Sequence, residues 1–262
     1  MLNLSELTDK VRALAIEAGD FIREERKKFH REAIEKKHAH DYVSYVDKES
    51  EKKIVTRLKE LLPEAGFIAE EGSGTLNDEQ YCWLVDPLDG TTNFIHDNAP
   101  YCVSIALRSK KKLLLGVVYE ICRNECFWTY KGAPSYLNGN EIHVSAISNL
   151  DDSFIALGFP YATEEYKPMA NHLVNTLYGN VAGLRLMGAA AVELCYIAAG
   201  RFEARIEAFI GPWDIAAGTI ILQNAGGMIT DFKGGDSYSS GSQVLASNGR
   251  IHRDLLNIID NL

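Results

Sequence analysis

Two aspartates at the end of an apolar segment carry the chemistry that this sequence suggests first. Residues 81–85 have the composition of a buried strand, and Asp86 and Asp89 follow it with a proline between them. Gly90 permits a tight turn, and the two threonines that come next are residues that commonly open a helix. The segment 83–94 therefore predicts carboxylate oxygens beside backbone N–H groups, an arrangement that suits a metal ion and a phosphate.

Further acidic residues stand at the ends of other predicted elements. Glu70 begins an acidic pair after an apolar segment, and Asp214 precedes a helical pattern. Taken alone, Asp214 would be a helix cap, Glu70 part of a solvated loop, and the aspartates at 86 and 89 ordinary turn residues. If all four carboxylates converge, their charges repel one another unless a cation lies among them. Such an all-oxygen site, with the main-chain carbonyl of Leu88, would suit Mg²⁺.

The elements that must position these residues follow from the hydrophobic periodicity. The first half of the chain predicts two amphipathic helices and a set of short strands, over residues 4–22, 47–62, 67–69, 81–85, 103–108, 113–120 and 126–130. The second half alternates strands and helices, over residues 154–157, 165–178, 189–199, 202–207, 214–224, 228–232, 244–247 and 251–262. We expect one domain over 1–262, built as an α+β half (1–150) and an α/β half (151–262) packed together.

Composition excludes several classes of protein. The chain has 262 residues and a formal net charge of −9, which argues against a nucleic-acid or membrane-surface binder. No apolar run reaches the roughly 20 residues that a membrane helix needs. The N-terminus has no basic flank followed by an apolar stretch, so we expect no secretory signal. Five cysteines predict free thiols and a cytoplasmic location, with Cys122 and Cys126 expected to be packed rather than metal-binding.

The pattern resembles the inositol monophosphatase family of lithium-sensitive, magnesium-dependent phosphatases. Residues 83–94 match its first motif, and residues 213–218 running to 225–227 match its second. The acidic pair at 70–71 and the stretches 41–47 and 188–192 fall in the expected order. Residues 210–212 lack the His found there in some animal members, so the chain resembles bacterial relatives.

The resemblance implies a layered α-β-α-β-α sandwich, a homodimer, and two or three Mg²⁺ ions in each active site. It implies that Glu70, Asp86 and the Leu88 carbonyl hold one ion and that Asp86, Asp89 and Asp214 hold a second. A third ion would lie near Glu70 and Asp47. The resemblance implies further roles as follows: phosphate binding by the N–H groups of Gly90 and Thr91, contacts with substrate hydroxyls by Asp89, Ala190, Ala191, Glu207 and Asp214, and a basic N-terminal loop position at Lys36.

For the mechanism we expect direct attack by water, with Glu70 and Thr91 orienting it and Asp89 at the reacting centre. A phospho-aspartyl route is the rival, although its two carboxylates usually stand two residues apart rather than three. We expect a small phosphate monoester as the partner, above all myo-inositol monophosphate. Fructose 1,6-bisphosphate, 3′-phosphoadenosine 5′-phosphate, NADP and histidinol phosphate are the alternatives on this scaffold.

Two observations bear on these alternatives. Glu207 at a hydroxyl-facing position favours a polyol, and no basic cluster for a second phosphate is evident, since Arg185 and Arg205 are expected to be ordinary surface residues. A non-catalytic regulatory binding protein is the alternative from another class. Loss of metal ligands would mark such a protein, and all the expected ligands are present in this chain.

Overall fold

Seven α-helices are found in the computed structural model, which describes residues 2–30, 34–38, 41–73, 80–159 and 163–260. They are α1 (Leu4–Arg26), α2 (Tyr45–Leu61), α3 (Thr91–Ile95), α4 (Thr163–Leu177), α5 (Ala190–Ala198), α6 (Pro212–Asn224) and α7 (His252–Ile259), with a 3-10 turn, η2, at Ser237–Ser240. No helix in the described ranges is long and apolar enough to cross a bilayer.

The strands form two large sheets and a hairpin. The first sheet has the order β3 (Ala65–Ala69), β4 (Tyr81–Asp89), β5 (Cys102–Ser109), β6 (Lys112–Glu120), β7 (Glu125–Tyr130), β8 (Ser135–Leu137) and β9 (Asn140–Ile142). The second has the order β11 (Gly183–Arg185), β10 (Phe154–Gly158), β12 (Ala204–Ala208), β14 (Gln243–Ser247) and β13 (Met228–Thr230). The hairpin pairs β1 (Ile34–His38) with β2 (Asp41–Ser44).

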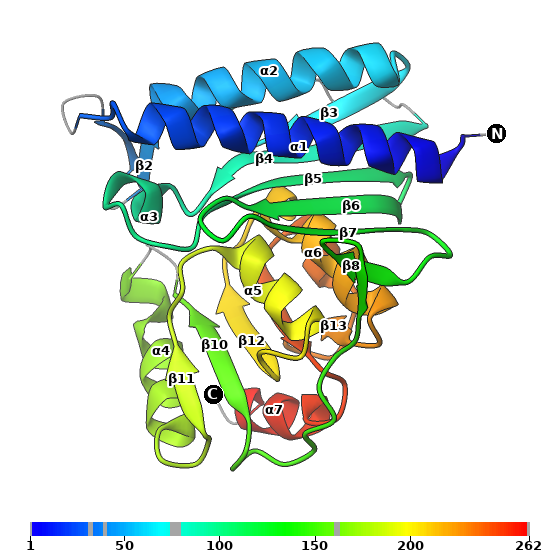
Figure 1. The fold of residues 1–262 in the computed structure, drawn as a ribbon. Helices are drawn as coiled ribbons and strands as arrows, with labels where there is room; N and C mark the ends of the chain where they lie inside the picture. Colours follow the sequence, from blue (N-terminus) through cyan, green and yellow to red (C-terminus); the bar gives the residue numbers. More distant parts are fainter. Residues whose placement is uncertain (1, 31–33, 39–40, 74–79, 160–162, 261–262) are drawn as a thin grey trace.

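Helices and sheets alternate in five layers, as Figure 1 shows. α1 and α2 cover the outer face of the first sheet, α5 and α6 lie between the two sheets, and α4 and α7 cover the second. The middle core contains residues from both halves of the chain, such as Leu84 and Val118 beside Ile221 and Ala246. The predicted α-β-α-β-α sandwich is therefore confirmed.

The position of β4 inside this sandwich explains its composition. Trp83 and Val85 belong to the core under α1 and α2, whereas Leu84 between them belongs to the core around α5 and α6. Because both faces are covered, the strand is apolar throughout instead of alternating with polar residues. This buried strand carries Asp86 and Asp89 into the interior of the molecule.

Side-chain caps explain where the first two helices begin. The Asn3 side chain accepts a hydrogen bond from the Glu6 N–H at 3.3 Å at the start of α1. At the start of α2, Ser44 and Asp47 form a reciprocal capping box, which satisfies backbone donors that have no partner inside the helix. The cap sets the start of α2 at Tyr45, two residues earlier than the sequence predicts.

Most differences from the predicted elements concern short strands. The hairpin β1–β2 was not predicted, and neither were the three-residue strands β8, β9 and β11, which are too short to show a period. The thiols also differ in part from expectation. All five cysteines are free, but Cys122 is exposed, so its predicted packing is wrong.

Candidate active site

A β-bulge in β4 brings the two motif aspartates to the same face of the sheet. Asp86 lies opposite Ser104 of β5 and Asp89 lies opposite Cys102, so β4 has one extra residue over this stretch. In a regular strand, residues three apart point to opposite faces. The extra residue reverses the alternation. Leu88 therefore packs in the α1–α2 core, while both carboxylates face α5 and α6.

The first turns of α5 and α6 meet these carboxylates. The Asp89 carboxylate accepts hydrogen bonds from the N–H groups of Ala190 at 3.1 Å and Ala191 at 2.8 Å. Asp214 accepts a hydrogen bond from the Gly211 N–H at 2.8 Å. Asp214 thus caps α6, as the simple explanation predicts, and its side chain also lines a cavity.

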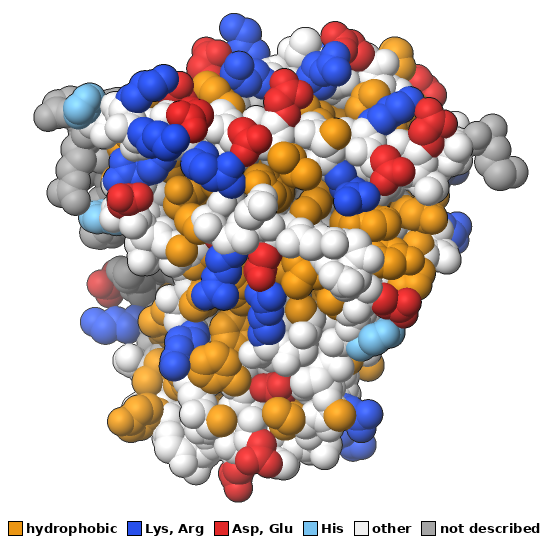
Figure 2. All heavy atoms as spheres, viewed as in Figure 1, with side chains coloured by type: hydrophobic (Ala, Val, Ile, Leu, Met, Phe, Trp, Pro, Cys, Tyr) orange, Lys and Arg blue, Asp and Glu red, His pale blue; other side chains and the backbone are white. Residues whose placement is uncertain are grey.

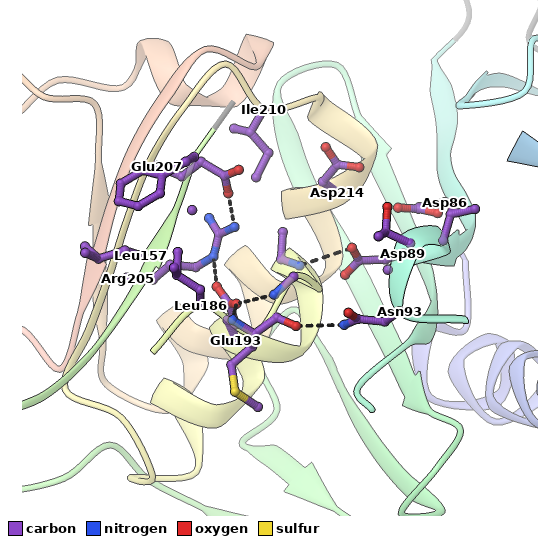
Figure 3. A pocket seen from close by; sticks show the side chains of 18 of the residues that line it. Asp86, Asp89, Asn93, Leu157, Leu186, Glu193, Arg205, Glu207, Ile210 and Asp214 are labelled. Atoms are coloured by element: carbon purple, nitrogen blue, oxygen red, sulfur yellow. Dashed lines mark hydrogen bonds and ion pairs between the residues drawn. The ribbon is translucent and has the colours of Figure 1, made fainter. Parts of the chain in front are cut away.

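A cavity of about 590 Å³ joins these residues. Figure 3 shows Asp86, Asp89 and Asp214 on one side and Glu207 with Arg205 on the other. The predicted residues that line it are Glu70, Asp86, Leu88, Asp89, Gly90, Thr91, Ala190, Glu207 and Asp214. Ala191 is not among the lining residues and reaches the site only through its N–H bond to Asp89.

Burial and mutual repulsion disfavour the charged forms of the aspartates. The pKa of Asp86 is raised well above its ordinary value, first by burial and then by the negative charges of Glu70, Asp89 and Asp214. Burial and the charge of Asp214 raise the pKa of Asp89 to about 7. In the described part of the chain, neither Asp86 nor Asp89 forms an ion pair with a Lys or Arg. The protein itself therefore leaves this negative charge largely uncompensated.

The chemistry of these donors fits a divalent cation. Carboxylate oxygens and the Leu88 carbonyl are hard ligands of the type that Mg²⁺ takes. The described residues contain no ready-made group of three His, Cys, Asp or Glu side chains at metal-binding spacing.

Thr91 is held between two oxygen acceptors. Its hydroxyl lies 2.9 Å from Oδ1 of Asp47 and 3.0 Å from the carbonyl oxygen of Leu88, and it can donate to either. Burial raises the pKa of Asp47, which also caps α2. Gly90, which precedes Thr91, has φ +91°, and an added Cβ would lie 3.0 Å from the Pro100 carbonyl oxygen. Only glycine fits this approach.

Two sequence expectations, a helix after Gly90 and a role for Lys36, have different outcomes. α3, which follows Gly90, has only five residues. Its macrodipole therefore contributes little, and an anion would be bound by individual backbone N–H groups. Lys36 lies in β1, where its backbone pairs with Tyr42, but its side chain is outside the described residues. The predicted role of Lys36 stays a prediction.

The prediction that Arg205 is a surface residue is wrong. Its side chain is 3% exposed and lies between Glu193, whose Oε2 accepts from Nε at 2.5 Å, and Glu207, which accepts from Nη2. Glu193 is buried as well and accepts hydrogen bonds from the N–H groups of Met187 and Gly188, both at 3.1 Å. Arg185, by contrast, is exposed as expected.

Glu193 was missed as a functional residue, although the sequence held a signal for it. It is the one charged residue of α5, and Arg205 is the one basic residue of β12, whose other charged residue is Glu207. Opposite charges in two buried elements indicate a buried ion pair, since unpaired charges are costly inside a protein. Glu207 then stands at the cavity with 15% of its side chain exposed.

Similarity to known proteins agrees with this geometry. The model of the inositol monophosphatase family matches residues 3–261. "Nus factor SuhB" of Pasteurella multocida is 39% identical over 225 residues, 85% of this chain and 84% of that protein. The extragenic suppressor protein suhB of Bartonella henselae has a TM-score of 0.90 and 32% identity, covering 96% and 97% of the two chains.

Two further likenesses are to proteins named as inositol monophosphatases. The enzyme of Anabaena (Nostoc) has a TM-score of 0.89 and 30% identity and covers 100% of this chain and 98% of that one. SaIMPase-II, 25% identical with a TM-score of 0.82 and covering 97% and 94%, has been crystallised with inositol monophosphate and with 2′AMP. The family match over nearly the whole sequence and the shared fold agree with each other. This chain belongs to the inositol monophosphatase family.

Proposed function

We propose that this chain is a Mg²⁺-dependent phosphatase that hydrolyses a small phosphate monoester, with myo-inositol monophosphate as the first candidate substrate. One observation carries the proposal. Four carboxylates from three parts of the chain line a single cavity: Glu70 after β3, Asp86 and Asp89 of β4, and Asp214 of α6. The same cavity contains a hydroxyl-binding candidate, Glu207. The ligands of SaIMPase-II are phosphate monoesters as well, which supports this substrate class.

The residues of the chain would divide the work as follows. Two or three Mg²⁺ ions, when bound by the four carboxylates and the Leu88 carbonyl, would supply charge neutralisation and Lewis-acid activation of the attacking water. Glu70 and the Thr91 hydroxyl would orient that water, and Asp47 would fix the Thr91 hydroxyl through the 2.9 Å contact. The N–H groups of Gly90 and Thr91 would bind phosphoryl oxygens.

Arg205 favours an uncharged polyol as the leaving group. Arg205 lines the cavity, but Glu193 and Glu207 enclose and neutralise its guanidinium. The more exposed side chain of the Arg205–Glu207 pair is the carboxylate, which can act as an acceptor. Glu193, Arg205 and Glu207 together have a net charge of −1. A hydroxyl group can donate to Glu207, whereas a second phosphate would be repelled there. This argues against fructose 1,6-bisphosphate, NADP and 3′-phosphoadenosine 5′-phosphate.

Assembly and inhibition belong to the same proposal. Leu186 and Phe209 line the cavity although they are 65% and 67% exposed, and large exposed apolar side chains commonly mark contact surfaces. They support a homodimer with its interface beside the active site. A mass of two chains in light scattering would agree, and one chain at micromolar concentration would contradict it. Lithium inhibition and a cytoplasmic location complete the proposal.

A panel of monoesters with and without Mg²⁺ tests the function. We expect phosphate release from myo-inositol 1-phosphate with Mg²⁺, none with EDTA, and much slower release from fructose 1,6-bisphosphate and 3′-phosphoadenosine 5′-phosphate. The name "Nus factor SuhB" of the curated relatives keeps regulatory binding as the second candidate. No release from any ester at saturating Mg²⁺ would contradict the phosphatase and favour that second candidate.

A further inference from the structure

A second cavity of about 680 Å³ lies on another side of α6 and shares no lining residue with the first. Its floor is α6, and its walls are the β5–β6 turn, the β7–β8 turn and the serine-rich turn η2. The volume lies within the usual range of pockets for small ligands. None of the residues that line it has a part in the proposed phosphatase chemistry.

The rim of this cavity is basic. Arg108, Lys111, Lys112 and Lys131 line it, and Asp236 is the single acid among its lining residues. None of the four cations has a carboxylate within ion-pair distance in the part of the chain that the structure describes. The local charge is therefore about +3 in a chain whose net charge is −9.

Basic residues elsewhere are arranged differently. On α1, Lys10 pairs with Glu6, Arg12 with Asp9, and Lys27 with Glu24. Figure 2 shows the result over α1 and α2, where basic and acidic side chains alternate. Four cations without acidic partners around one cavity thus differ from these paired residues of α1, and they provide a positive field for a ligand.

The floor of the cavity combines apolar area with a polar group that has no partner. Ile215, Ala216 and Ile220 of α6 and Leu84 of β4 supply the apolar part. The Thr219 hydroxyl on the same helix is buried, with the residue 2% exposed, and it makes no hydrogen bond within the described structure. Buried polar groups without partners are uncommon in folded proteins, and the position of this hydroxyl on the wall of the cavity leaves it available to a ligand.

The remaining wall is the Gly/Ser-rich segment 234–242. Ser237, Ser239 and Ser240 line the cavity and add hydroxyl groups opposite the cations, and the half-buried Tyr238 adds an aromatic face. No residue of this segment lines the first cavity. Cations, hydroxyls and an aromatic face around an apolar floor suit a ligand with an anionic head and an apolar body.

We propose that this cleft, bounded by α6, the β5–β6 turn and η2, is a second binding site that takes a small organic anion with an aromatic or aliphatic body. The proposal does not depend on the phosphatase activity. It predicts binding that requires the negative charge of the ligand and the cations of the rim, and that leaves the first cavity free.

A matched pair of probes separates charge from apolar contact. Naphthalene-1-sulfonate and naphthalene-1-sulfonamide share their ring system, but only the first is anionic. Titration calorimetry of the full chain with each probe should give one site, with the sulfonate bound about tenfold more tightly than the sulfonamide. Equal affinities, or no sulfonate binding at millimolar concentration, would overturn the proposal.

Variants then locate the site. In Arg108→Gln/Lys112→Gln the preference for the sulfonate should fall to about twofold or less. Lys10→Gln/Lys27→Gln removes the same charge from α1 and should keep the preference unchanged. If the first double variant does not fold, Lys111→Gln and Lys131→Gln on the exposed turns should each weaken sulfonate binding by about twofold to threefold. An equal loss in the α1 control would show a bulk charge effect and contradict the proposal.

Competition gives a third test. Inorganic phosphate with Mg²⁺ should not displace the sulfonate, since the two cavities share no residues. Displacement would place the probe in the first cavity and overturn the assignment. Binding of a poly-glutamate peptide together with no binding of the sulfonate would assign the cleft to an acidic protein segment and overturn it equally.

Discussion

Two buried groups of charged side chains face each other across the first cavity, and they are balanced in different ways. Asp86 and Asp89 have like-charged neighbours and backbone N–H donors, and in the described part of the chain neither has an ion-pair partner. Glu193 and Glu207 are both bound by Arg205, and Glu193 also accepts two backbone hydrogen bonds. In the proposed function a cation from solution neutralises the first group, whereas the second group already contains a cation, Arg205.

This difference separates reactive from positioning residues. A group of carboxylates that repel one another gains stability when a divalent ion binds, so its function is coupled to the metal. A neutralised and hydrogen-bonded group instead keeps its geometry whether or not a ligand is present. The Glu193–Arg205–Glu207 network is of this second kind. It links the candidate hydroxyl acceptor to the segment that leads into α5, whose N–H groups hold Asp89.

The largest expected effect comes from removing a shared member of the first group. Asp86→Asn should lower phosphate release by about 10⁴-fold, because several kcal/mol of charge stabilisation depend on it. The variant should stay folded, since it removes a buried charge that has no cationic partner. Thermal unfolding with and without Mg²⁺ checks this. Mg²⁺ should stabilise the wild type much more than the variant. An equal stabilisation of both proteins would contradict a role for Asp86 in binding Mg²⁺.

Removing the cation of the second group should affect folding instead. Arg205→Met leaves Glu193 buried without its partner and should cost about 3–5 kcal/mol in the free energy of unfolding. Urea denaturation measures it. Arg201→Met is the matched control, since Arg201 pairs with Glu125 at a site that is one-third exposed, and it should cost about 1 kcal/mol or less. Similar losses in the free energy of unfolding for the two variants would contradict the claim that Arg205 neutralises a buried carboxylate group.

His252 is buried and titratable as well, and it differs from both groups of the first cavity because folding favours its neutral form. Its ring nitrogens lie 2.9 Å from the hydroxyls of Ser247 and Thr230, and burial lowers its pKa to about 4. Folding thus favours the neutral form of His252. Its contribution to the free energy of unfolding is fully present above about pH 6.5 and is lost as the pH falls toward 4. From pH 7.5 to 5, wild-type protein should lose about 2 kcal/mol that His252→Gln does not lose.

Urea titrations at the two pH values measure this difference. The exposed His143 provides the control, because His143→Gln should show the same pH dependence as the wild type. Other buried groups titrate in both proteins and cancel in the comparison of wild type with variant. A pH dependence that is unchanged in His252→Gln would rule out the buried neutral histidine.

The smallest expected effect concerns substrate choice. Glu207→Gln replaces a charged acceptor with a weaker neutral one. It should lower kcat/KM for myo-inositol 1-phosphate by about tenfold, and that for p-nitrophenyl phosphate, which offers no hydroxyl group, by less than about threefold. Steady-state kinetics with both esters give the ratio. A parallel loss on the two substrates would show that Glu207 supports the metal-binding side of the cavity rather than the leaving group.

Local patterns in the sequence predicted the layers and the motif well. The segment 81–95 predicted a buried strand, two carboxylates and a turn, because its apolar run, its two aspartates and its glycine are all visible in the local sequence. The helices α1, α2, α5 and α6 followed from their periodicity or their continuous apolar runs, and their boundaries moved by a few residues. Caps such as Ser44 account for part of that shift.

Features that depend on a partner distant in the chain could not be predicted from local sequence patterns. The bulge that turns Asp86 and Asp89 to one face exists only in the pairing of β4 with β5. The burial of Arg205 depends on Glu193, twelve residues away in another element, so the sequence indicates this ion pair only when the two residues are considered together. The short strands β8, β9 and β11 form only against neighbours that are already in place.

Metal dependence measured on the full chain tests the central claim most directly. After removal of divalent ions with EDTA and exchange into metal-free buffer, phosphate release from myo-inositol 1-phosphate should fall to background and return on addition of Mg²⁺. Equilibrium dialysis should find two or more Mg²⁺ ions for each wild-type chain and fewer for Asp86→Asn. Full activity without divalent ions, or the same Mg²⁺ stoichiometry in both proteins, would contradict the account.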